Sequence, residues 1–121
     1  MGFVPVTPCS VFDSRDGGGL LAGQSTTLVQ VGGSCGVPAD AVGVMVNVVA
    51  VAPVRTGNLR ISASGSAAQG GVVNFGAGFT NSNAVPVELS SSGAVDVFVN
   101  SPEVPATHVR LVVFGYYSNP V

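Results

Sequence analysis

One stretch of this sequence decides the fold class: VGVMVNVVAVA, residues 42–52. Valine is β-branched and favours strands over helices. Because both faces of a strand with this sequence are apolar, the stretch predicts a central strand that is covered on both sides. It is too short for a membrane-spanning helix, contains Asn47 and is followed by Pro53.

Further short runs rich in β-branched residues are separated by turn sequences such as DGGG at residues 16–19 and SSSG at residues 90–93. No window shows a helical period. The runs are Phe3–Thr7, Thr26–Val31, Val42–Ala52, Asn58–Ser62, Gly71–Phe75, Ala84–Leu89, Ala94–Val99 and Thr107–Tyr117. We therefore predict an all-β fold: a single antiparallel β-sandwich (jelly-roll or Ig-like) of about eight strands, with residues 1–121 as one domain.

The chain is poor in charge. Charged residues make up 8% of the 121 residues, lysine is absent, and 46% of the residues are hydrophobic. An ordinary soluble domain is about a quarter charged, so much of this surface is expected to rest against another copy, a neighbouring domain, a wall or a ligand. The four arginines are scattered and the net charge is −2, which excludes nucleic acid as a partner.

Each of the two cysteines, Cys9 and Cys35, lies beside turn residues. We predict one disulfide between them, which favours an oxidising, extracellular or cell-surface location; two unpaired thiols are the alternative. No signal-peptide pattern follows Met1, so a secreted protein with this sequence is expected to have lost its signal or to belong to a longer parent.

The last predicted strand is apolar on two faces towards its end. Val109, Leu111 and Val113 alternate on one face, and the opposite face carries His108, Arg110, Val112, Phe114 and Tyr116. Phe98 repeats this pattern in the strand before it. A loop or a partner must cover the second face. We predict that Phe98, Val112, Phe114 and Tyr116 form an interface with another copy of the chain.

Motifs along most of the chain are TPCSVFDSR at residues 7–15, CGVP at 35–38, VNV at 46–48, VNF at 73–75, NAV at 83–85, THV at 107–109 and GY at 115–116. In this order they resemble an uncharacterised all-β module of secreted proteins from actinobacteria and other soil bacteria. The resemblance implies a surface or extracellular accessory domain, appended to enzymes or repeated, with no established activity. Such modules have arginine where this chain has Ser10 and aspartate where it has Val112. If the two positions face each other, an ion pair has been lost from both sides at once.

The segment GGSCG, residues 32–36, matches the G-x-S-x-G nucleophile pattern, and Ser34, Asp96 and His108 follow in hydrolase order. That motif requires a helix directly after the serine, which Pro38 disfavours, so we predict no enzyme. His108 is the only histidine, and we expect it to make a tethering hydrogen bond. Neither a transition metal nor a cofactor is expected.

Structural roles are also expected for four further polar residues. Asp13 and Arg15 should hydrogen-bond neighbouring strands while Asp16 caps a turn, although the two carboxylates could instead hold calcium. Asn47 must find hydrogen-bond partners if it is buried, and the backbone of a neighbouring loop would satisfy it.

These observations favour a non-enzymatic extracellular structural or attachment module that self-associates or packs with like domains into a surface assembly or filament. The alternative is a carbohydrate-binding module that binds cell-wall or other polysaccharide. Sugars bind to exposed aromatic rings beside polar groups, and the candidates are Phe79, Asn81, Asn83 and Tyr117. The absence of tryptophan counts against this alternative.

Overall fold

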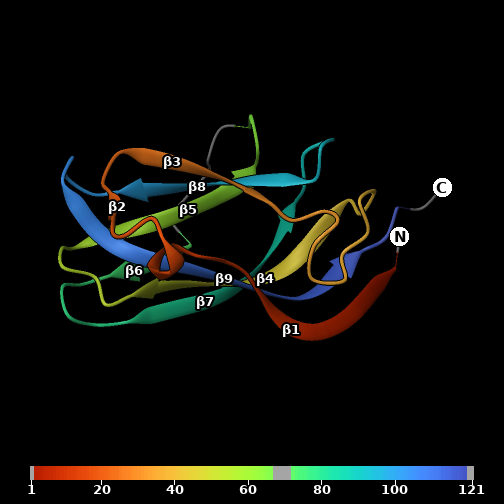
Figure 1. The fold of residues 1–121 in the computed structure, drawn as a ribbon, viewed down its shortest axis with the longest axis horizontal. Coiled ribbons are helices and arrows are strands. Elements are labelled where there is room, and N and C mark those ends of the chain that lie inside the picture. Colours follow the sequence, from red (N-terminus) through yellow and green to blue (C-terminus); the bar gives the residue numbers. More distant parts are fainter. Residues whose placement is uncertain (1, 67–71, 120–121) are drawn as a thin grey trace.

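The computed structural model describes residues 2–66 and 72–119. They form two antiparallel β-sheets that pack face to face (Figure 1). The elements are β1 (Phe3–Asp13), the single-turn 3₁₀ helix η1 (Ser14–Asp16), β2 (Leu21–Ala22), β3 (Ser25–Gln30), β4 (Gly43–Val51), β5 (Gly57–Ala63), β6 (Val73–Phe75), β7 (Asn81–Glu88), β8 (Ala94–Asn100) and β9 (Pro105–Tyr117). The predicted sandwich is confirmed, with nine strands instead of about eight. Gly71, which begins one predicted run, lies outside the described residues.

The strands pair like the two arms of one long hairpin: β1 with β9, β3 with β8, β4 with β7, and β5 with β6. Winding this hairpin adds the pairs β4–β9 and β5–β8. The first sheet therefore has the order β1-β9-β4-β7, with β2 beside β9, and the second sheet has the order β3-β8-β5-β6. Of the two predicted arrangements, this strand order is that of a jelly roll.

One continuous apolar core fills the space between the sheets. It is built from the inward side chains of valine-rich strands, because alternate residues of a strand face the same side. Val48 in β4 and Leu111 in β9 have no exposed surface, and neither do Leu59 in β5 and Val97 in β8. Each such side chain stabilises the fold by about 1.5–3 kcal/mol relative to leaving it exposed.

The prediction for residues 42–52 holds in part. Strand β4 is central in the first sheet, between β9 and β7, and its inward side chains are buried. Its outward side chains, however, are only half-buried: Met45, Asn47, Val49 and Val51. Nothing within the described residues covers this side of the strand, so Asn47 faces outward and does not need the loop partner that burial would require.

A β-bulge in β9 corrects the predicted face of Tyr116. Met45 lies opposite Gly115 and Val46 opposite Val113, so Phe114 is an extra residue in the ladder. One extra residue inverts the alternation of all positions after it. Tyr116 therefore lies opposite the buried Val44 and packs against the core instead of sharing the outward face with Phe114.

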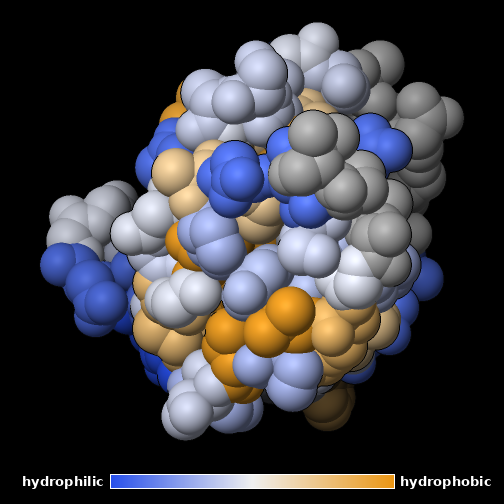
Figure 2. Space-filling model, turned by 90° about the vertical axis from the view of Figure 1, so that its right-hand side faces the viewer, coloured by the Kyte–Doolittle hydropathy of each residue, from blue (hydrophilic) through white to orange (hydrophobic). Residues whose placement is uncertain are grey.

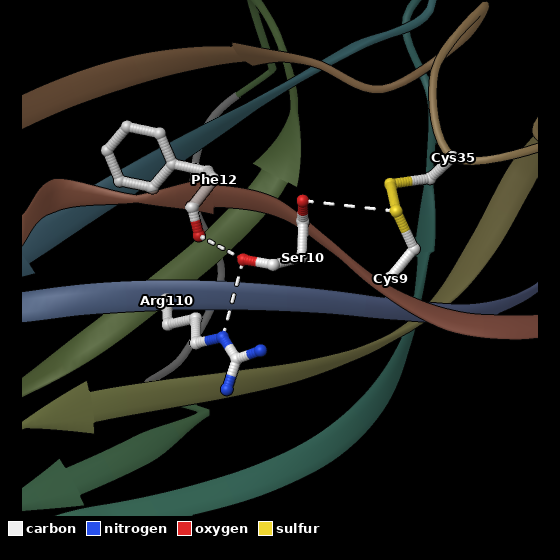
Figure 3. The surroundings of a disulfide bond; sticks show 5 residues. All are labelled: Cys9, Ser10, Phe12, Cys35 and Arg110. Carbon is white, nitrogen blue, oxygen red and sulfur yellow. Dashed lines mark hydrogen bonds between the residues drawn. A yellow bond between two sulfur atoms is a disulfide. The ribbon is translucent and has the colours of Figure 1, made fainter. Parts of the chain in front are cut away.

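The predicted disulfide is confirmed. Cys9 in β1 is bonded to Cys35 in the connection between β3 and β4, with the two Cα atoms 5.7 Å apart (Figure 3). The two ends of the described chain meet at one end of the sandwich, where the Gly2 and Ser118 backbones are joined by a hydrogen bond of 2.9 Å (Figure 1). We call this the terminal end. Within residues 2–66 and 72–119, no helix has the length and apolar character needed to cross a membrane.

Candidate functional site

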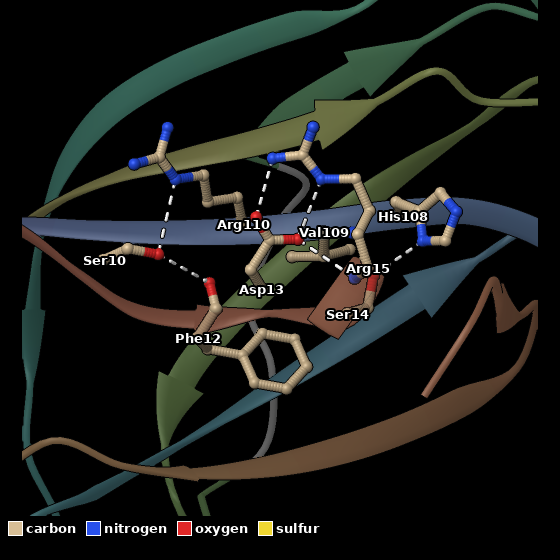
Figure 4. Close-up of polar contacts among 8 residues, drawn as sticks. All are labelled: Ser10, Phe12, Asp13, Ser14, Arg15, His108, Val109 and Arg110. Carbon is tan, nitrogen blue, oxygen red and sulfur yellow. Dashed lines mark hydrogen bonds and ion pairs between the residues drawn. The ribbon is translucent and has the colours of Figure 1, made fainter. Parts of the chain in front are cut away.

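A polar cluster lies where β1 ends beside β9 (Figure 4). Asp13 caps η1 by accepting the backbone N–H of Arg15, and its two oxygens also accept Nε at 3.0 Å and Nη2 at 2.6 Å from the same arginine. This pairing with Arg15 lowers the pKa of Asp13 to about 2 and raises the pKa of Arg15. This cap links residues two apart in the chain, whereas we expected Asp13 and Arg15 to hydrogen-bond neighbouring strands.

Ser14 and His108 tie η1 to β9. The Ser14 hydroxyl accepts the Val109 backbone N–H at 2.9 Å and lies 3.1 Å from Nδ1 of His108 (Figure 4). Ser14 is 1% exposed, and its contacts with His108 and Val109 hold two elements together. His108 makes a tether of the kind expected from the sequence. Its partner Ser14 was missed, because nothing in the local sequence marks that serine as buried.

The residues in hydrolase order are not brought together. Asp96 lies on the outward side of β8 in the second sheet, where it accepts hydrogen bonds from the Ser64 hydroxyl at 3.0 Å and the Gly65 N–H at 3.1 Å. His108 belongs to β9 in the first sheet, and Ser34 lies in the turn after β3. A proton relay among the three is therefore impossible in this fold.

The calcium alternative finds no support in the geometry. Both carboxylate oxygens of Asp13 are engaged by Arg15, which leaves Asp16 without a second carboxylate partner. In the described part of the chain, no three histidine, cysteine, aspartate or glutamate side chains lie close enough to hold a metal ion.

Ser10 and Val112 are direct cross-strand partners in the β1–β9 ladder. The two positions at which the chain departs from the module that it resembles therefore face each other. Instead of an ion pair, Ser10 Oγ accepts a hydrogen bond of 3.3 Å from Nε of the adjacent Arg110 (Figure 3). The Ser10–Val112 pair carries no charge, so this part of the surface is more apolar than an ion pair would make it.

The four residues predicted for an interface do not share a surface. Val112 and Phe114 lie on the outward side of the first sheet, and Tyr116 packs against the core. Phe98 lies on the outward side of the second sheet, at the opposite side of the sandwich, where the Arg60 guanidinium carbon lies 5.8 Å from the centre of its ring.

The two outward sides differ sharply in character. The outward side of the second sheet carries two apolar side chains, Leu28 and Phe98, and is otherwise mostly polar. Its polar side chains are Thr26, Gln30, Asn58, Arg60, Ser62, Asp96 and Asn100. On the first sheet the central outward positions are mainly apolar. We call these apolar positions on the first sheet the apolar face and define it by Met45, Val49, Ala84, Pro86, Val112 and Phe114.

The candidate sugar-binding residues are also dispersed. Asn81 donates to the Asn74 carbonyl at 2.7 Å and Asn83 to the Val72 carbonyl at 3.1 Å, so both amides latch the edge of β7 to the edge of β6. Phe79, 75% exposed, lies in the loop before β7. Tyr117 pairs with Gly43, whereas Asn81 pairs with Ala50, which puts Tyr117 and Asn81 about 23 Å apart along the sheet.

No protein-family model matches this sequence, and no curated protein is significantly similar to it. The two outward sides therefore give the strongest indication of an interaction surface. The two sheets have similar numbers of strands, but only the first sheet is mainly apolar on its outward side as well as on its inward side.

Proposed function

We propose that this chain is a non-enzymatic extracellular structural or attachment module that self-associates through the apolar face. The observation that carries the proposal is the outward side of β4. If the outward side of this sheet faced only water, polar residues would be expected at the outward positions of β4. Three of these positions are instead apolar: Met45, Val49 and Val51. A mainly apolar surface, interrupted at its middle by Asn47, on a protein this poor in charge is typical of an interaction site.

The partner best suited to this face is a second copy. The central positions of the face carry no charge, so two copies can meet there about a two-fold axis without burying an unpaired ion. Arg110 and Glu88, which lie towards opposite ends of the face, can remain at the rim of such a contact. Repeated contacts of this kind would build a surface assembly.

An extracellular or cell-surface location is supported by the Cys9–Cys35 disulfide, since such bonds persist in oxidising compartments. The resemblance to modules of secreted bacterial proteins supports the same location. Carbohydrate binding by Phe79, Asn81, Asn83 and Tyr117 together is not proposed, because two of these side chains are engaged as latches and the other two lie at opposite ends of the sandwich.

Sedimentation velocity over about 1 µM to 1 mM, which covers association free energies of about −8 to −4 kcal/mol, tests the proposal. We expect the wild-type protein to shift from monomer towards a larger species across this range. Phe114→Glu should keep it monomeric by placing a charge within the apolar face. Circular dichroism checks that the variant remains folded.

Two variants on the second sheet provide matched controls. Leu28 is 61% exposed and Phe98 is half-buried, so Leu28→Glu and Phe98→Glu add the same charge to the other side of the sandwich. Both should associate like the wild type. A wild-type protein that stays monomeric throughout would overturn the proposal, and so would equal loss of association in all three variants.

A further inference from the structure

A cleft of about 750 Å³ opens at the terminal end of the sandwich. It lies between the segment that leads into β4 (residues 39–43), the end of β7 with the turn after it (residues 86–91), and Tyr117 at the end of β9. Figure 2 looks onto this end and shows apolar residues gathered in its lower part, on the side of the first sheet, beside hydrophilic ones. This size is within the range of about 300–1,000 Å³ that small-molecule sites occupy.

Gly43 lines the cleft, and its missing side chain lets the Tyr117 ring lie close to the backbone of β4. It pairs with Tyr117 on one side and with Glu88 on the other, so these two residues flank it about 10 Å apart across three strands. A Cβ at position 43 would lie 3.0 Å from the Val87 carbonyl oxygen and 3.4 Å from Cδ2 of Tyr117. Any other residue would therefore crowd the Val87 carbonyl and contact the Tyr117 ring.

The Tyr117 ring is held in place from its other side. The Phe3 ring packs against it, with the two ring centres 5.2 Å apart and their planes at 55°. An aromatic ring held in place beside the cleft offers a ready surface for an apolar ligand face, and it loses little conformational freedom when a ligand binds.

Two carboxylates with unused hydrogen-bonding capacity line the same cleft. Glu88 and Asp40 are exposed, and neither carboxylate accepts a hydrogen bond or an ion pair from the described residues. The Ser91 hydroxyl is likewise exposed. No lysine, arginine or histidine is among the described residues that line the cleft. The site thus combines one ring with strong acceptors and a hydroxyl.

We propose that this cleft binds a neutral oligosaccharide. A sugar ring presents an apolar C–H face, which suits Tyr117, and hydroxyl groups around its edge, which donate to the carboxylates of Glu88 and Asp40 in charge-assisted hydrogen bonds. An acidic sugar, a phosphate or a sulfate would be repelled by the two carboxylates. A cationic group would also donate to these carboxylates, so a basic peptide is the competing ligand that the experiment has to distinguish.

The proposal goes beyond self-association and is tested by a different measurement. The probes are neutral gluco-, manno-, xylo- and chito-oligosaccharides on an array, with hexuronate oligomers and an oligo-arginine peptide as charged comparisons. Hits are then titrated by isothermal calorimetry with the disulfide intact. Sedimentation of each variant is measured in parallel, so a change in association is seen separately from a change in sugar binding.

Two pairs of variants locate the site. Glu88→Gln removes one carboxylate with little change in shape, and Glu103→Gln makes the same change in the exposed loop after β8. Tyr117→Leu removes the ring from the cleft, and Phe79→Leu removes an exposed ring from the opposite end. We expect the first member of each pair to weaken neutral-sugar binding at least about tenfold, which is 1.4 kcal/mol, and its control to leave it unchanged.

Binding of a neutral oligosaccharide with this pattern of losses would establish the site. The absence of binding by every neutral sugar, or preferential binding of the oligo-arginine peptide, would overturn the proposal. So would sugar binding that both cleft variants leave intact, since the ligand would then sit elsewhere on the molecule.

Discussion

The Cys9–Cys35 disulfide should contribute a large share of the stability of this domain. The bonded cysteines are 26 residues apart. A cross-link of this span removes conformational entropy from the unfolded chain, and the chain-entropy relation gives about 3.5 kcal/mol at 25 °C. Unfolding of a 121-residue chain has an entropy of about 2.1 cal/mol/K per residue, so loss of the bond should lower Tm by about 14 °C.

Urea denaturation followed by circular dichroism, with and without dithiothreitol, measures this contribution. The reduced protein should unfold with a lower free energy and a larger m-value, because its unfolded state exposes more surface. The double variant Cys9→Ala with Cys35→Ala should match the reduced protein and should not respond to dithiothreitol. A difference below about 1 kcal/mol between the oxidised and reduced proteins would refute the entropic reasoning, and free thiols in the oxidised protein would refute the bond itself.

Three further predictions concern the local structure. Gly23→Ala should destabilise the fold by about 1–3 kcal/mol or more, because the added Cβ would overlap the backbone of the β8–β9 connection. Gly76→Ala adds a Cβ in open space and should leave the melting temperature in thermal melts unchanged. Ser14→Ala should cost about 1–3 kcal/mol in urea denaturation, since it leaves a buried N–H of β9 without its acceptor. Arg15→Lys should lower Tm at pH 6, where the Asp13 carboxylate is charged. Because pairing depresses the pKa of Asp13 from 3.8 to about 2, the stability that it supplies is lost as the pH falls from about 4 towards 2, and melts of the variant over this range should decline less steeply.

The fold class was predictable because it depends on local patterns. Runs rich in β-branched residues, bounded by glycine and serine turns, located β3, β4, β5, β7, β8 and β9 to within a few residues. The order of the strands was not predictable, because period two says which residues share a face and nothing about which strands are neighbours.

Irregular segments account for the differences in detail. Strand β1 continues to Asp13, well beyond the predicted end at Thr7. Its second half was not predicted because its pairing with β9 shifts register twice, so the sequence has no clean alternation there. The bulge at Phe114 could not be predicted either, because the sequence alone does not show where the register of a strand shifts. Strand β2 has only two residues, too few for any pattern.

The candidate surfaces depend on long-range neighbours and were harder to predict. The apolar outward side of β4 was visible as a run without polar alternation, and this signal held. The cleft was not visible, since Gly43 looks like a weak point inside a valine-rich strand until Tyr117 and Glu88 are seen on either side of it. Asn81 and Asn83 looked like ligand-binding amides, and only the edge of β6 explains them.

The meeting of both chain ends at one end of the sandwich has a mechanical consequence. A force that pulls on Gly2 and Ser118 acts across the β1–β9 ladder and opens its hydrogen bonds one after another, as in a zipper, instead of shearing them together. Peeling that starts at Phe3 stops at Cys9, where the disulfide carries the load directly to Cys35. The 26-residue span between the two cysteines, about 90 Å when extended, stays out of the path of the force until the bond is reduced.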